Sequence, residues 1–136
     1  MMKKPIAIKP SIAASGTWTL PGTINLIRCR TFSVSLRSTC GASIDANILV
    51  EAFYSPDGNN WDSVSIDSYE VDFSAGSTVQ ESAVLKVPEH GYIYLKVTNL
   101  SDADTLTGTS IWYSIQSHNN TIDVSMGSVE KKGPYQ

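Results

Sequence analysis

The sequence lacks any concentration of positive charge and any long hydrophobic run. Lys and Arg number 10 against 13 Asp and Glu, giving a net charge of −3, and basic runs never exceed two residues. A nucleic-acid-binding protein needs a concentrated basic face to displace counterions, so we expect no nucleic-acid partner. No window approaches the ~20 apolar residues of a membrane-spanning helix, so we expect no membrane association.

The first ten residues begin like a signal peptide but do not continue as one. Lys9, Pro5 and Pro10 interrupt the apolar stretch well before the ~7–15 residues that a signal core requires. We therefore expect the chain to be made and kept in a cytoplasm, without a signal peptide, or to be exported inside a larger particle.

Cysteine is scarce as well. Cys29 and Cys40 stand eleven positions apart, and an extended strand between them would separate the sulfurs by roughly 25 Å or more. A disulfide needs Cα atoms within about 7 Å, so we expect two free thiols. The pair has neither CxxC spacing nor a nearby His, and we expect no metal site from it.

The residues that could carry catalysis are few. His90 lies in a predicted turn and His118 lies past the last predicted strand, and no GxSxG motif supplies a nucleophile. Glu51 could pair with Asp72 or Glu81 as in a sandwich glycosidase, but nothing distinguishes these carboxylates from the other acidic residues. We predict that the protein is not an enzyme and uses no cofactor.

What the sequence does have is apolar residues at alternate positions, the pattern of half-buried strands. Turn signals separate the runs every ten residues or so, and no segment has helical spacing. This predicts an all-β protein, an antiparallel β-sandwich of jelly-roll or Ig-like type with seven or eight strands. The apolar sets lie within 32–36, 48–53, 61–66, 69–73, 79–87, 93–97 and 111–115.

The strongest turn signal is the segment 55–60, Ser-Pro-Asp-Gly-Asn-Asn. Pro56 presets φ for a turn, and Gly58 and Asn59 tolerate positive φ, so this segment predicts a hairpin. Asp57 also opens a run that superficially looks like a calcium loop, but Gly stands second and Ser68 twelfth, against the EF-hand pattern. A loose calcium site using Asp57 and Asp62 stays open.

The ends of the chain differ from its middle. Residues 1–22 contain three prolines and read as an extended N-terminal arm, with one strand expected around Ser11–Leu20. Residues 23–116 form the predicted sandwich domain. Residues 117–136 are polar and hold too few large apolar groups to pack alone, so we expect a C-terminal tail that becomes ordered on neighbouring subunits.

Three tryptophans are candidate contacts with a partner or a glycan: Trp18, Trp61 and Trp112. Trp112 lies between Ile111 and Tyr113, so it points outward if those two residues face the core. Outward aromatic side chains mark contacts with a partner and can form a platform for sugar rings. Coverage by an edge strand or by the N-terminal arm is the alternative for Trp112.

Two stretches resemble a known class of domain. Residues 52–61, with Ser55, Asp57, Gly58 and Trp61, resemble the S-x-D-G-x-x-W hairpin of many phage and prophage virion domains, and discoidin-like glycan-binding domains have a similar hairpin. Residues 92–99, Tyr-Ile-Tyr-Leu-Lys-Val-Thr-Asn, resemble the strand that follows it in those virion domains. The resemblance covers roughly residues 30–116 and does not include the two ends.

The resemblance implies a small accessory β-sandwich component of a virus particle, such as a capsid decoration (cement) protein, a head-fibre base or a tail-surface module. Such a protein acts through contacts with other virion proteins and with copies of itself, and it would be located in the virion. The alternative hypothesis is a carbohydrate-binding module that uses exposed aromatic residues.

Overall fold

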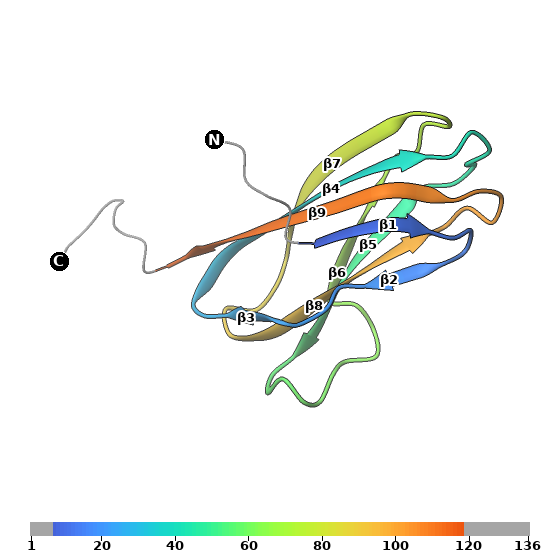
Figure 1. Cartoon of the computed structure of the whole chain (residues 1–136). Helices are drawn as coiled ribbons and strands as arrows, with labels where there is room; N and C mark the ends of the chain where they lie inside the picture. The colour runs from blue at the N-terminus through green and yellow to red at the C-terminus, as the bar shows by residue number, and fades with distance from the viewer. Residues whose placement is uncertain (1–6, 119–136) are drawn as a thin grey trace.

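The computed structural model of the protein describes residues 7–118, and in this range it is all-β, with no α-helix (Figure 1). Two antiparallel sheets are present, so the predicted all-β sandwich is confirmed. The sheets contain nine strands in the described residues, whereas seven or eight were predicted. The strands are β1 (Ala7–Ile12), β2 (Thr17–Thr19), β3 (Ile24–Leu26), β4 (Cys29–Cys40), β5 (Ile48–Ser55), β6 (Asp67–Val71), β7 (Thr78–Leu85), β8 (Gly91–Asn99) and β9 (Leu106–Ser117).

The strands divide between a first sheet and a second sheet. The first sheet has the order β1-β9-β4-β7, and the second has the order β2-β8-β5-β6, with β3 also paired to β8. Along residues 7–118 the chain changes sheet six times: between β1 and β2, β3 and β4, β4 and β5, β6 and β7, β7 and β8, and β8 and β9. As Figure 1 shows, the long strands β4 and β9 lie side by side in the first sheet.

The core lies between the sheets and follows the predicted alternation. On β4, Phe32, Val34 and Leu36 are fully buried, while the residues between them face outward. The second sheet contributes matching rows from β5 and β8, including Val50 and Leu95, which are at most 1% exposed. Each sheet therefore has one face in the core and one outer face, as expected for antiparallel sheets in a sandwich.

The predicted N-terminal arm is wrong for the residues that the structure describes. β1 pairs with β9 along the edge of the first sheet, and Ile12, Trp18 and Leu20 belong to the core. Pro10 fits because β1 is an edge strand, where a residue without an N–H breaks no ladder. The sandwich thus already includes Ala7 instead of beginning at residue 23, and residues 1–6 lie outside the described range.

Two further boundaries differ from the predictions. Residues 61–66 do not form a strand, because they belong to the connection between β5 and β6 and make only scattered backbone bonds to β5, such as Ile66 N to Ala52 O. β9 ends at Ser117, one residue beyond the predicted end of the sandwich domain at residue 116. Residues 119–136 of that tail lie outside the described range.

The two cysteines stand at opposite ends of β4; both are free, as predicted, and both are buried. Burial, and secondarily the nearby Glu89 carboxylate, raises the pKa of the Cys29 thiol above its ordinary value. Both effects disfavour the thiolate, which is the reactive form. Cys29 is therefore a core residue whose thiol form is favoured.

Candidate functional site

The turn after β5 is built around one carboxylate. Asp57 Oδ1 accepts hydrogen bonds from the backbone N–H groups of Asn59 and Asn60, each at 2.8 Å, and from the Ser55 hydroxyl at 3.0 Å. Its Oδ2 accepts a bond from the Asn60 side-chain amide at 2.7 Å. These donors lower the pKa of Asp57. The turn predicted at Pro56, Asp57, Gly58 and Asn59 is present, with Gly58 at φ +82°, whereas Asn59 does not adopt positive φ.

This hydrogen-bond network also bears on the loose calcium site that the sequence left open at Asp57 and Asp62. Both carboxylate oxygens of Asp57 already accept hydrogen bonds from donors within the turn. Ca²⁺ takes six to eight oxygen ligands, and the turn does not gather them. Within residues 7–118, no group of three His, Cys, Asp or Glu side chains could hold a metal ion. Asp57 therefore shapes the connection between β5 and β6.

An aromatic cluster covers part of the outer face of the second sheet. Tyr94 stacks on Phe53 with ring centroids 5.0 Å apart, and Trp61 meets Tyr94 edge-on, also at 5.0 Å. Lys96 Nζ lies 5.2 Å above the Phe53 ring and 3.9 Å from Glu51. Phe53 is only 7% exposed although it lies on an outer face, because these neighbours cover it. We call this set, Phe53, Trp61, Tyr94 and Lys96, the aromatic cluster.

The structure places the three candidate tryptophans in three different environments. Trp18 is 8% exposed and belongs to the core, so the prediction that it contacts a partner is wrong. Trp61 is half-buried in the aromatic cluster, and Trp112 is half-buried on the outer face of the first sheet. No single platform therefore contains all three. Trp18 was misassigned because its strand was predicted as part of an arm.

The outer face of the first sheet has an unusual composition. Cys40, Ser38 and Leu36 point inward, and the alternate positions of β4, β7 and β9 point outward, mostly with hydroxyl or amide groups. Ser35 and Ser82 exchange a hydrogen bond at 2.5 Å across β4 and β7, and Thr39 and Thr78 do the same at 2.9 Å. We call this surface the hydroxyl face: Thr31, Ser33, Ser35, Arg37, Thr39, Thr78, Gln80, Ser82, Val84, Ser110, Trp112, Ser114 and Gln116.

Trp112 is the aromatic residue of the hydroxyl face, on its β9 strand. It lies opposite Ser35, which in turn lies opposite Ser82, so one row crosses three strands. Arg37 is the one charged residue among the residues that define this face. Two large apolar side chains stand at its sides, Val84 on β7 and Ile8 on β1, which are 65% and 63% exposed. The face is therefore broad, nearly uncharged and partly apolar.

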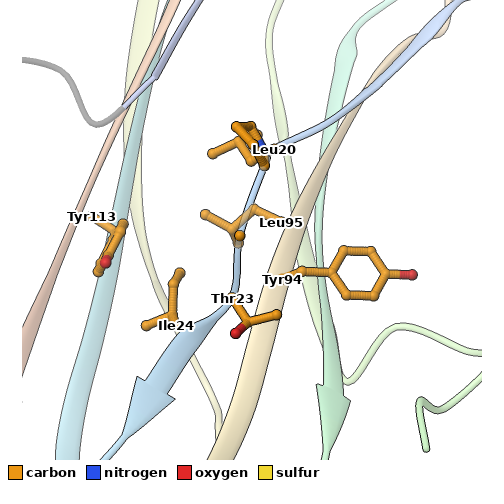
Figure 2. Close-up of a pocket in the computed structure, with 8 residues that line it drawn as sticks. Leu20, Thr23, Ile24, Tyr94, Leu95 and Tyr113 are labelled. Atoms are coloured by element: carbon orange, nitrogen blue, oxygen red, sulfur yellow. The ribbon is translucent and has the colours of Figure 1, made fainter. Parts of the chain in front are cut away.

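A small cavity opens between the sheets beside β3. Figure 2 shows Tyr113 on one side of it and Leu20, Ile24 and Leu95 on the other, whereas the Tyr94 ring points away. Its volume is about 60 Å³, far below the roughly 300 Å³ at which pockets for small-molecule ligands begin. The lining is mostly apolar, so the cavity offers no constellation for binding or catalysis.

The acidic residues and histidines do not converge. Glu51 lies on the outer face of the second sheet beside Lys96, whereas Glu81 is opposite the inward residue Leu36 on β7. The Asn47 amide donates to Asp72, which holds that carboxylate at the end of β6 and away from Glu51. His118 lies 3.4 Å from the exposed Glu89. No pair proposed from the sequence forms a catalytic arrangement.

The comparisons with known proteins add no assignment. No protein family model matches this chain, and no curated protein is significantly similar to it. No helix in residues 7–118 is long and apolar enough to cross a membrane.

Sequence reasoning missed the hydroxyl face and Tyr94. The signal for the face was present, because the polar positions of 31–39 and 78–84 are mostly Ser and Thr, but it required the pairing of three strands that are distant in sequence. Tyr94 could have been found from the pairing of residues 48–55 with 92–99, which makes it the cross-strand neighbour of Phe53.

Proposed function

We propose that this protein is a structural component of a phage-like virus particle, a capsid decoration or other virion-surface protein that acts through subunit contacts. The observation that carries the proposal is the hydroxyl face, where Arg37 alone is charged and Trp112 is the aromatic residue. Depletion of Lys, Asp and Glu together with the presence of aromatic residues is a compositional feature of protein interfaces, although the many serines of this face are not.

Physical chemistry favours covering such a face. Desolvating charged side chains is expensive, and the hydroxyl face requires it at Arg37 alone. Its hydroxyl groups can donate and accept hydrogen bonds with a partner, while Trp112, Val84 and Ile8 supply apolar surface worth about 25 cal/mol per Å² buried. A cement protein stabilises a shell through contacts of this kind across its subunits.

The resemblance to virion domains supports the particle in particular. The two stretches that carry it belong to neighbouring strands, since β5 leads into the Asp57 turn and pairs with β8 along its whole length. Trp61, the last residue of the first stretch, contacts Tyr94 in the second stretch. The resembling residues therefore form one packed unit and not two unrelated segments.

A fractionation experiment tests the proposal. Particles from a culture that produces the protein are banded on a density gradient, and the chain is followed with an antibody. We expect wild type and Trp61→Ala in the particle band, and Trp112→Ala mainly in the soluble fraction, with a circular dichroism spectrum like that of wild type. A wild-type chain that never bands with particles, or a Trp112→Ala variant that bands equally well, would contradict the proposal.

Carbohydrate binding is a second candidate, and the aromatic cluster favours it. Trp61 and Tyr94 lie at the surface next to the paired charges of Lys96 and Glu51, which could form hydrogen bonds with sugar hydroxyls. On a glycan array this function predicts binding by wild type and by Trp112→Ala, and loss of binding by Trp61→Ala. The two functions thus assign opposite roles to the same two variants. A wild-type chain that binds no glycan on the array excludes this candidate.

A further inference from the structure

The strand β7 ends the first sheet on one side. Its backbone pairs with β4 over eight consecutive residues, from Thr39–Thr78 to Phe32–Leu85, without a register shift. Among residues 7–118, no strand pairs with its other side. Regular edge strands of this length are templates for another chain, because their outward N–H and C=O groups have no ladder partner.

The side chains of β7 offer little protection against such pairing. Proteins usually blunt an edge with proline, lysine, a bulge or an inward charge. β7 contains no proline and no bulge, and its outward residues are Thr78, Gln80, Ser82 and Val84, all uncharged. The one protective feature is Glu81, which shares the inward side with Leu36. An inward carboxylate selects among registers but does not block the edge.

We propose that β7 is a self-association edge, which pairs antiparallel with β7 of a second copy around a two-fold axis beside Ser82. Ser82 then lies opposite Ser82 of the second copy, Gln80 opposite its Val84, and Glu81 opposite its Ala83. Val79 and Leu85 pair on the inward side. The two first sheets become one continuous sheet with four strands from each copy, and the two hydroxyl faces merge.

The register follows from charge and from the faces of the strand. A pairing centred on Glu81 would put two carboxylates directly opposite each other, which is destabilising. A shift by one residue would set inward positions opposite outward ones, so the two second sheets would lie on opposite sides of the joined sheet. The register centred on Ser82 avoids both problems and uses the whole strand.

Contacts with β6 fix the position of β7. β6, the edge strand of the second sheet, lies close to β7, and the Lys86 N–H donates to Asp67 on β6 at 2.7 Å. The Tyr69 hydroxyl on β6 reaches the Glu81 carbonyl. β7 therefore presents its free side from a fixed position, so pairing costs little further ordering.

This inference deepens the proposed function, because it names the contact by which copies would assemble with one another, and it can be tested without particles. The purified full chain is examined for mass by analytical ultracentrifugation at rising concentration. We expect a two-fold symmetric dimer for wild type and for the control Ser114→Lys/Gln116→Lys, which changes exposed positions of β9. Gln80→Lys/Val84→Lys places lysines opposite each other in the paired edge and should be monomeric, with an unchanged circular dichroism spectrum.

Cross-linking with a short thiol reagent tests the register. Ser82→Cys should give a covalent dimer in high yield, whereas Ser114→Cys, also exposed on the hydroxyl face, should give none. The double variant Gln80→Cys/Val84→Cys should also give a covalent dimer, because position 80 lies opposite position 84 of the second copy. The yield of covalent dimer from either single variant should be at least several-fold lower. The native Cys29 and Cys40 are buried and supply the background measured with wild type.

Several results would overturn the inference. They are a monomeric wild type up to hundreds of micromolar, a dimer that persists in Gln80→Lys/Val84→Lys, and equal cross-linking at Ser82→Cys and Ser114→Cys. Each would leave the particle fractionation of Trp112→Ala unaffected, so failure of the edge contact is distinguishable from failure of the proposed function.

Discussion

The hydroxyl of Tyr69 on β6 lies 3.2 Å from the main-chain oxygen of Glu81 on β7, so one side chain joins the two sheets where both end. The same hydroxyl lies 3.4 Å from the Val34 carbonyl. A phenol has one proton, so it donates to one of these oxygens at a time. Burial, and secondarily the Glu81 carboxylate, raises the pKa of Tyr69 above its ordinary value.

Tyr69→Phe removes this link while keeping the ring. We expect the free energy of unfolding to fall by about 1 kcal/mol, the usual net value of one hydrogen bond. Because the pKa is raised in the folded state, Tyr69 favours folding below its unfolded pKa of about 10, and this contribution is lost as the pH rises further. Urea unfolding from neutral to alkaline pH measures both. A wild-type stability that falls above pH 10 no more steeply than that of Tyr69→Phe would contradict this.

Asp57→Asn tests the carboxylate of the turn. The lowered pKa means that ionised Asp57 stabilises the folded state, fully above the unfolded carboxyl pKa of about 4 and progressively less as the pH falls through the lower folded value. We therefore expect Asp57→Asn to have a lower thermal midpoint than wild type at neutral pH. The difference between the two midpoints should be smaller in strong acid. Asp62→Asn, at an exposed position in the same connection, is the control. A gap between wild type and Asp57→Asn that does not change with pH would rule out the carboxylate as its cause.

Gly91→Ala tests a close contact at the start of β8. Gly91 has φ +112°, and an added Cβ would lie 2.5 Å from the Tyr54 hydroxyl, which donates to the His90 carbonyl. Gly22→Ala is the matched control, since Gly22 has φ +78° but open space around the new Cβ. We expect the control to lose about 1 kcal/mol from backbone strain and Gly91→Ala roughly 2 kcal/mol more from overpacking. Chemical denaturation gives both values, and equal losses would show that the Tyr54 contact does not matter.

Asn99→Leu tests how the N-terminal segment is held. The buried Asn99 amide donates to the carbonyls of Ala13 and Asp104, at 3.2 and 2.9 Å, and its oxygen accepts from Ser101 N–H. Leucine would leave several of these groups unpaired, and we expect a loss of about 3 kcal/mol or more. Faster amide exchange in β1 should accompany it. Asn25→Leu, exposed on β3, is the control. Unchanged exchange in β1 would mean that other contacts hold the segment.

The sequence predicted the strands and core residues well in the middle of the chain but poorly at its start. Phe32, Val34 and Leu36 alternate strictly, so period two alone predicted their strand and its buried side. Ile12 and Trp18 stand among prolines, glycine and small residues, and their burial depends on pairing with β9 and β8, which are far away in sequence. Local patterns do not carry such pairings, and the start of the domain was therefore placed too late.

The candidate site shows the same division. The Asp57 turn is a local structure, because its donors lie within three positions of the carboxylate, and the segment 55–60 alone therefore predicted that the chain turns there. The hydroxyl face and the free side of β7 depend on the strand order β1-β9-β4-β7, which the alternation of apolar residues does not determine. Period two gives the face of each residue, but not its neighbours across the sheet.

The burial of Cys29 and Cys40 at opposite ends of β4 gives the protein two internal reporters of local opening. Each thiol is at most 3% exposed, so a labelling reagent reaches it only when that end of the longest strands separates from the core. Comparing the two labelling rates in single-cysteine variants would reveal which end of the sandwich opens first. Adding a partner during labelling would show which end that partner clamps.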